Sequence, residues 1–144
     1  MRGVSMSTWT PLAAAIALAV SGAYSSFAVG AEMKVTLSGD QEVPPVTTAA
    51  KGSGTVTIGD DGSVKGSITT TGIAPTAAHI HIAAAGKNGP VIVPMVKSGD
   101  TGFAFPPDAK MNADQMKAFK AGDTYINVHS AANPGGEIRA QLKP

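Results

Sequence analysis

Short runs of β-branched residues, separated by Gly, Asp and Pro, are the feature that most constrains the fold of this chain. Residues 54–58 (GTVTI) and 63–70 (SVKGSITT) flank the turn 59–62 (GDDG), which is a strong hairpin signal. Pro94 lies inside another apolar run and indicates an edge strand or a bulge. The remaining predicted strands are 33–37, 77–83, 91–96, 102–105, 124–129 and 137–142.

One helix is predicted, at residues 113–120. Asn112 and Gln115 have the spacing of a capping box, and Gly122 is a suitable C-terminal stop. Many short strands with one short helix predict an all-β fold, an antiparallel Greek-key β-sandwich or barrel. The length of 144 residues predicts a single domain.

Residues 1–31 are predicted to be a secretory signal peptide rather than part of the fold. Arg2 provides the positive start and residues 11–20 (PLAAAIALAV) the apolar segment. Small residues before Glu32 fit a cleavage site, with Ala28 as the second candidate. A retained membrane anchor is the alternative, although the apolar run is short for a membrane span. We therefore expect a domain at 32–144 that is periplasmic or secreted and not membrane-attached once the signal is removed.

Charge in the predicted domain is balanced. The chain has 11 Lys and Arg and 10 Asp and Glu, and only Arg2 precedes residue 32, so the domain has zero net charge with neutral His. This balance does not support binding to nucleic acid or electrostatic attachment to acidic membranes. The chain has no cysteine, so a metal would need nitrogen or oxygen ligands, or a Met sulfur.

The three histidines of the chain are expected on polar strand faces. Side chains alternate along a strand, so His79 and His81 share one face of 77–83, with Cα atoms about 6.5–7 Å apart. Two imidazoles at this spacing can converge on one ion, and His129, at the end of 124–129, could be a third ligand. Such a site suits copper, zinc or nickel, and copper generally binds most tightly. The alternative is three solvent-facing histidines.

Four polar or aromatic side chains are predicted near these histidines. Tyr125 and Asn127 share the face of the third histidine, while Glu137 and Arg139 share the polar face of 137–142. Asn127 and Glu137 could fix the tautomer of an imidazole. Tyr125 could line the pocket or cap the edge of the core.

Three stretches resemble the CHRD domain, a module first described in chordin. They are residues 37–46 (LSGDQEVPPV), 77–90 (AAHIHIAAAGKNGP) and 125–142 (YINVHSAANPGGEIRAQL). The resemblance covers nearly the whole predicted domain. In animal chordin such modules accompany growth-factor binding, whereas bacterial single-domain members look like stand-alone exported proteins.

A second, local resemblance concerns chemistry. Residues 79–81 (HIH) are similar to the H-V-H copper strand of copper/zinc superoxide dismutases. Residues 128–129 (VH), the loop after them and residues 135–139 (GGEIR) are similar to the later copper histidine and the active-site arginine of that family. That family also has an antiparallel Greek-key β-barrel, in agreement with the predicted fold.

This local resemblance implies that one copper ion per chain is bound by His79, His81 and His129. It also implies that Arg139 attracts the anion, the alternative being a surface ion pair with Glu137 or Glu42. No further histidine is present for a zinc site and no disulfide is available. The implied site is therefore copper-only.

Three functional hypotheses follow. The first is a copper-only superoxide dismutase-like enzyme acting on superoxide or another small anion. The second is a copper carrier or buffer without turnover. The third is a non-enzymatic interaction module of the chordin type, for which the histidines are dispensable. Pairing of an exposed edge strand with a second copy would give a homodimer.

Overall fold

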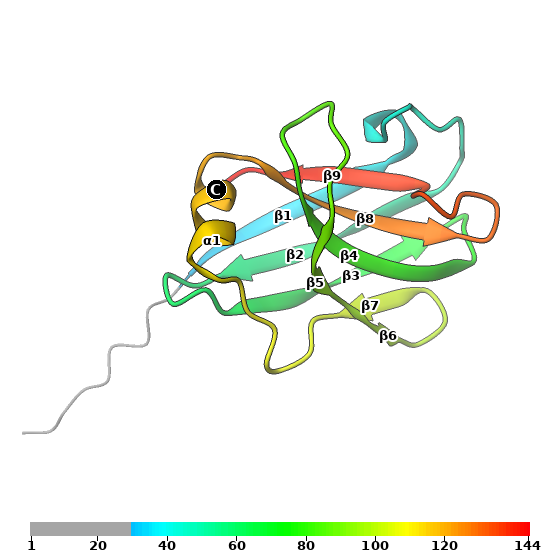
Figure 1. Cartoon of the computed structure of the whole chain (residues 1–144). Helices are drawn as coiled ribbons and strands as arrows, with labels where there is room; N and C mark the ends of the chain where they lie inside the picture. Colours follow the sequence, from blue (N-terminus) through cyan, green and yellow to red (C-terminus); the bar gives the residue numbers. More distant parts are fainter. Residues whose placement is uncertain (1–29) are drawn as a thin grey trace, which may run out of the picture.

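The computed structural model describes residues 30–144 of the chain (Figure 1). The predicted signal peptide falls almost entirely on residues outside this part. Within residues 30–144, no helix has the length and apolar character needed to cross a membrane. The described residues form nine strands, one 3-10 helix and one α-helix: β1 (Ala31–Ser38), η1 (Gly39–Gln41), β2 (Lys51–Ile58), β3 (Val64–Thr71), β4 (Pro75–Ile82), β5 (Val91–Pro94), β6 (Val96–Ser98), β7 (Gly102–Ala104), α1 (Ala113–Lys120), β8 (Thr124–Ser130) and β9 (Ile138–Leu142).

The strands form one antiparallel sheet that curls into a nearly closed barrel (Figure 1), in the order β5-β4-β8-β9-β1-β2-β3-β7-β6. Strands that are far apart in the sequence pair with each other, such as β4 with β8 and β9 with β1, and this order is of the Greek-key kind. Residues 91–98 connect the two edges, because β5 pairs with β4 and β6 pairs with β7. Between them, the N–H of Met95 donates to the carbonyl of Ala78 at 3.0 Å. The predicted all-β fold is confirmed.

The strand predicted at 91–96 is divided in two. Pro94 ends β5 on the edge of the sheet, where its missing N–H costs no ladder bond. The register against β4 also shifts, because Ile80 pairs with Val93 whereas His81 pairs with Val91. The structure therefore has both features that Pro94 indicated, an edge strand and a bulge.

The hairpin between β2 and β3 forms as its turn residues predict. The N–H of Gly59 donates to the carbonyl of Ser63, and the N–H of Gly62 donates to the carbonyl of Gly59, both at 2.9 Å. Gly62 has a positive φ of 85°, a conformation that a glycine adopts without strain.

Helix α1 is held by the predicted capping box. The side-chain oxygen of Asn112 accepts from the N–H of Gln115, and the Gln115 side chain accepts from the N–H of Asn112, both at 2.9 Å. Gly122, with φ of 81°, follows the helix end. The helix buries Met116 and Phe119 and lies at one end of the barrel (Figure 1).

The outer face of β4, β8 and β9 carries the polar side chains and is buried all the same. Alternation places residues such as Ile80 in the core and their neighbours outside. Two loops lie over this outer face: residues 83–90, here named the strap, and residues 39–50, here named the Glu42 loop (Figure 1). Beneath them Asn127 and Arg139 are each only 1% exposed. Loop packing therefore converts a polar sheet face into an enclosed polar layer.

Candidate metal centre

The structure brings the three histidines together. His129 pairs across the sheet with Ala77 and so lies diagonally next to His79. Nδ1 of His79 is 3.1 Å from Nε2 of His129, and one nitrogen from each histidine lies within 4.8 Å of the others. Two imidazoles on one tetrahedral metal, each about 2.0–2.1 Å from it, have nitrogens roughly 3.3 Å apart. The 3.1 Å separation of the first pair, a hydrogen-bond distance in the metal-free protein, is close to that of two ligands on one ion.

Main-chain carbonyls orient two of the rings. Nδ1 of His81 donates to the carbonyl of Gly89, and Nδ1 of His129 donates to the carbonyl of Pro134, both at 2.9 Å. A neutral imidazole with its proton on Nδ1 has a lone pair on Nε2. The nitrogens available to a metal are therefore Nε2 of His81 and Nε2 of His129. Nδ1 of His79 becomes the third once the proton that it donates to Nε2 of His129 moves to its other ring nitrogen.

Nε2 of His81 is buried and has no hydrogen-bond partner. His81 itself is 7% exposed, so solvent does not supply one readily. Leaving a buried polar atom unpaired costs about 1–3 kcal/mol, and native proteins rarely do so without a reason. A cation bound among the three imidazoles would satisfy this nitrogen.

Burial keeps these ligands neutral. Desolvation, together with smaller effects of the nearby His129 and His81, lowers the pKa of His79 to about 4. Burial also lowers the pKa of His81, against the opposing effects of the Gly89 carbonyl and the Asn127 side chain. Protons therefore compete weakly with a metal for these two rings at neutral pH.

A three-layer stack supports His81 from behind. The ring of Tyr125 lies parallel to that of His81, with centroids 4.7 Å apart and an interplanar angle of 3°. On the Tyr125 ring, the guanidinium carbon of Arg139 lies 3.4 Å from the centroid. Tyr125 thus lies between a candidate metal ligand and a buried cation, with its ring face against each.

The side chain of Arg139 holds the strap in place. Its guanidinium donates to the carbonyl of Lys87 at 2.8 Å, to Oδ1 of Asn88 at 3.2 Å and to Oε1 of Gln141 at 3.3 Å. The strap in turn supplies the Gly89 carbonyl that orients His81. Arg139 therefore acts on the histidines through the strap and the stack.

The hydrogen-bond partners of Asn127 and Glu137 lie in the Glu42 loop, which the sequence did not predict. Nδ2 of Asn127 donates to Oε1 of Glu42 at 3.4 Å, and Oδ1 of Asn127 is buried without a partner. Glu137 accepts a hydrogen bond from Thr48 at 2.9 Å and thereby ties the Glu42 loop to the start of β9. The two hydrogen bonds that set imidazole tautomers come from the carbonyls of Gly89 and Pro134, which no residue pattern identifies.

The comparison with protein families decides the identity of the domain. The CHRD domain family matches residues 33–142, which is most of the chain. This chain belongs to the CHRD family. Neither the search of curated proteins nor the search of solved structures gave a match.

The stretches that carry the CHRD likeness gather at the histidines. Residues 37–46 begin the Glu42 loop, residues 77–90 are β4 with the strap, and residues 125–142 are β8, β9 and the loop between them. Hydrogen bonds join all three, since Asn88 donates to the carbonyl of Val43 at 2.7 Å and Arg139 donates to the strap. These three stretches therefore form the enclosed polar layer around the candidate metal centre.

Proposed function

We propose that this CHRD protein binds one copper ion per chain through His79, His81 and His129. The observation that carries the proposal is the unpartnered, buried Nε2 of His81 beside two other imidazole nitrogens 3.1 Å apart. Neutral imidazoles suit copper, zinc and nickel, and copper has the highest affinity in the divalent series. Export follows from the predicted signal peptide, and N-terminal sequencing of the protein from its host would test the cleavage site.

We further propose superoxide dismutase-like turnover, in which two superoxide ions and two protons give O₂ and H₂O₂. Bound copper would supply the electron transfers by alternating between Cu(I) and Cu(II). The chain supplies the three ligands, and His79 and His129, which are only partly buried, mark the side from which an anion would approach. The positive charge of Arg139 would act there through its field, because its N–H groups already bind the strap.

Because the guanidinium of Arg139 already binds the strap, a second candidate function is also favoured, a copper carrier or buffer without turnover. Such a protein needs the same three histidines and no cation free to contact an anion. Superoxide consumption by fully copper-loaded protein separates the two candidates. A chordin-like interaction module would instead retain its activity when all three histidines are replaced.

The deciding experiment is titration of the protein with copper, anaerobically and in air, with electron paramagnetic resonance of the Cu(II) form. We expect one copper per chain and a spectrum with several nitrogen ligands. Absence of a specific copper signal from folded protein would reject both copper functions and favour the interaction module.

A further inference from the structure

We propose that Glu42 is a buried proton site that responds to the charge of the metal centre. Its carboxyl group holds a proton in the metal-free protein and releases it when a divalent cation binds the three histidines. This inference rests on the proposed metal binding and adds a residue that the histidine cluster does not include.

The surroundings of Glu42 are those of a protonated acid. The side chain is 4% exposed, and its one side-chain hydrogen bond is the long 3.4 Å contact from Asn127. Burial raises the pKa of Glu42, while Asn127, the Arg139 guanidinium and the N–H of Val43 oppose that rise only in part. A carboxylate with so few donors is costly to bury, whereas the neutral acid is not.

Gly136 makes room for this pair. A Cβ atom at Gly136 would lie 2.5 Å from Nδ2 of Asn127 and 2.5 Å from Oε1 of Glu42. The turn before β9 therefore packs its backbone directly onto the carboxyl group. The Glu42 carboxyl is held in a shaped site rather than left at the end of a mobile side chain.

A cavity of about 610 Å³ connects Glu42 to solvent, between the Glu42 loop and the loop that follows β8. Prolines, glycines, asparagines and small residues form its walls, and Glu42 is the one ionisable side chain among its lining residues. A proton leaving the carboxyl group thus has a direct exit to water. Arg139 of β9 is the charged side chain that acts on Glu42 from the sheet below.

One side chain separates Glu42 from the histidines. Asn127, which binds Glu42, is the cross-strand partner of His79 on β4 and of Arg139 on β9. A dication at the histidines would favour the ionised carboxyl through this buried region, because charges interact strongly where water is excluded. In the proposed step, the metal-free site with protonated Glu42 binds one M²⁺. The products are the metal-bound site with ionised Glu42 and one H⁺ in solution.

The test counts protons released on binding Cu²⁺. Calorimetric titrations of the full chain, in buffers of different ionisation enthalpy and from about pH 5 to pH 7, give this number for each variant. We expect the original chain to release up to one more proton per copper than Glu42→Gln. Glu32→Gln is the control, because the Glu32 side chain is exposed on β1, and it should release as many protons as the original chain. Equal release by the original chain and Glu42→Gln overturns the inference.

Infrared spectroscopy provides an independent reading without copper activity. The metal-free chain should show the C=O band of a buried protonated carboxyl group, and this band should disappear on Cu²⁺ binding and in Glu42→Gln. The comparison of metal-free with copper-bound protein needs only the original chain, so it can be made even if Glu42→Gln does not fold. A chain that binds no copper rejects the proposed function and the coupling. The band in metal-free protein still shows separately whether Glu42 is protonated, and its absence overturns the inference whatever copper does.

Discussion

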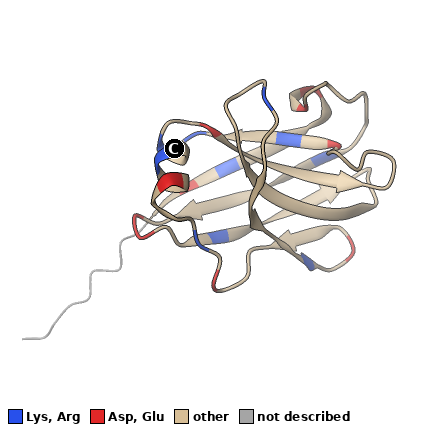
Figure 2. Cartoon of the chain, in the orientation of Figure 1, with Lys and Arg blue, Asp and Glu red and all other residues tan. Residues whose placement is uncertain are grey.

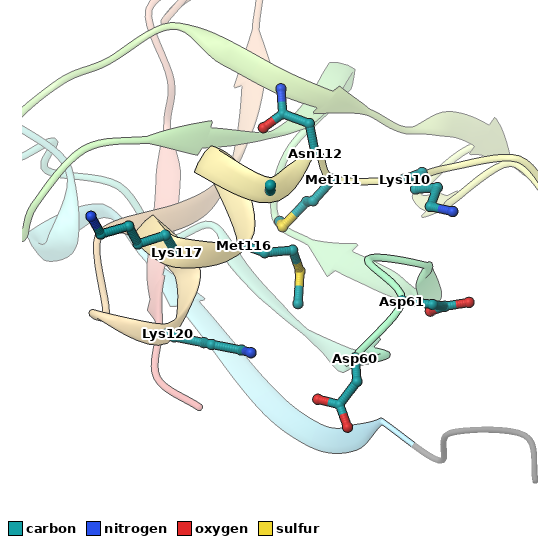
Figure 3. Close-up of a pocket in the computed structure, with 9 residues that line it drawn as sticks. Asp60, Asp61, Lys110, Met111, Asn112, Met116, Lys117 and Lys120 are labelled. Carbon is teal, nitrogen blue, oxygen red and sulfur yellow. The ribbon is translucent and has the colours of Figure 1, made fainter.

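Two hollows of similar size lie on this barrel and differ in what their walls contain. The cavity beside Glu42 measures about 610 Å³, and the pocket beside α1 measures about 600 Å³ (Figure 3). The second has more charged side chains, among them Asp60, Asp61, Lys110, Lys117 and Lys120. Figure 2 shows acidic and basic residues close together around α1 and the β2–β3 turn.

The charges of the α1 pocket are exposed, and the polar group of Asn112 is already used in the helix cap. Around the histidines, in contrast, His81, Asn127, Glu42 and Arg139 are all less than a tenth exposed, and two of them have unpartnered polar atoms. A charged side chain in contact with solvent costs little free energy and needs no ligand. A buried polar atom without a hydrogen-bond partner is costly, and a bound ligand can satisfy it. The size of a hollow and its surface charge therefore indicate a ligand site less well than the unpartnered buried atoms around the histidines do.

The sharpest test of this contrast is His81→Ala. Loss of the buried Nε2 ligand should weaken copper binding by more than about 100-fold, beyond the effect expected for supporting residues. Competition titration against a chelator of known affinity measures this loss. Lys117→Ala, in the α1 pocket, should leave the copper affinity unchanged. An unchanged affinity in His81→Ala would remove His81 from the site.

A second substitution tests the packing of the enclosed polar layer. Gly136→Ala should lower the free energy of unfolding by about 2–3 kcal/mol, because the new Cβ meets Asn127 and Glu42 and because φ is 128°. Gly135→Ala is a control one residue away, with nothing within 4 Å of the added Cβ. Urea unfolding of the two variants measures the difference. Equal stability would show that the turn can move away from Glu42.

A third substitution tests whether Arg139 acts by positioning. Arg139→Lys keeps the charge but loses the planar group that covers Tyr125 and binds the strap. We expect roughly 10-fold weaker copper binding and faster hydrogen exchange at the Gly89 N–H. Lys143→Ala, on the exposed C-terminal segment, should change neither. A variant that loses superoxide turnover while the copper affinity and the exchange rate stay normal would favour anion guidance instead.

The last test concerns the pH dependence of metal-free stability. The folded pKa of His79, about 4, lies below the ordinary value of 6.5, so the unfolded state binds more protons between these values. Stability should therefore fall as pH drops from 6.5 to 4, by roughly 2 kcal/mol after allowance for solvent screening. His79→Gln should flatten this slope, as followed by urea unfolding at several pH values.

Glu42 should act in the opposite direction. Its folded pKa is raised above 4.5, so its contribution to stability is present below that pH and is lost as pH rises through the folded value. Glu42→Gln should therefore steepen the loss of stability on acidification. A slope unchanged by both substitutions would contradict the burial of these two groups.

Much of the fold could be predicted from local pattern. Alternation along the strands placed the three histidines, Asn127 and Arg139 on polar faces, and the structure confirms this arrangement. The β2–β3 turn and the α1 capping box were also predictable, since each depends on residues within a few positions of one another. Even the edge position of Pro94 followed from its missing N–H.

The surroundings of the histidines could not be predicted in this way. Glu42 meets Asn127 across 85 positions of sequence, and the carbonyls of Gly89 and Pro134 bind imidazoles through atoms that every residue has. The resemblance implied that Arg139 attracts an anion, with a surface ion pair as the alternative. The structure buries its guanidinium against Tyr125 and the strap, so Arg139 is not a surface side chain, and its action on an anion stays a proposal.

The sequence by itself determined which side chains share a strand face, because side-chain direction alternates with every residue whatever the partner strand. Only the tertiary structure decided that β4 and β8 pair in a register that sets His129 beside His79, and that two loops then cover the polar face. Register and loop packing depend on contacts between residues far apart in the chain, which local periodicity does not encode.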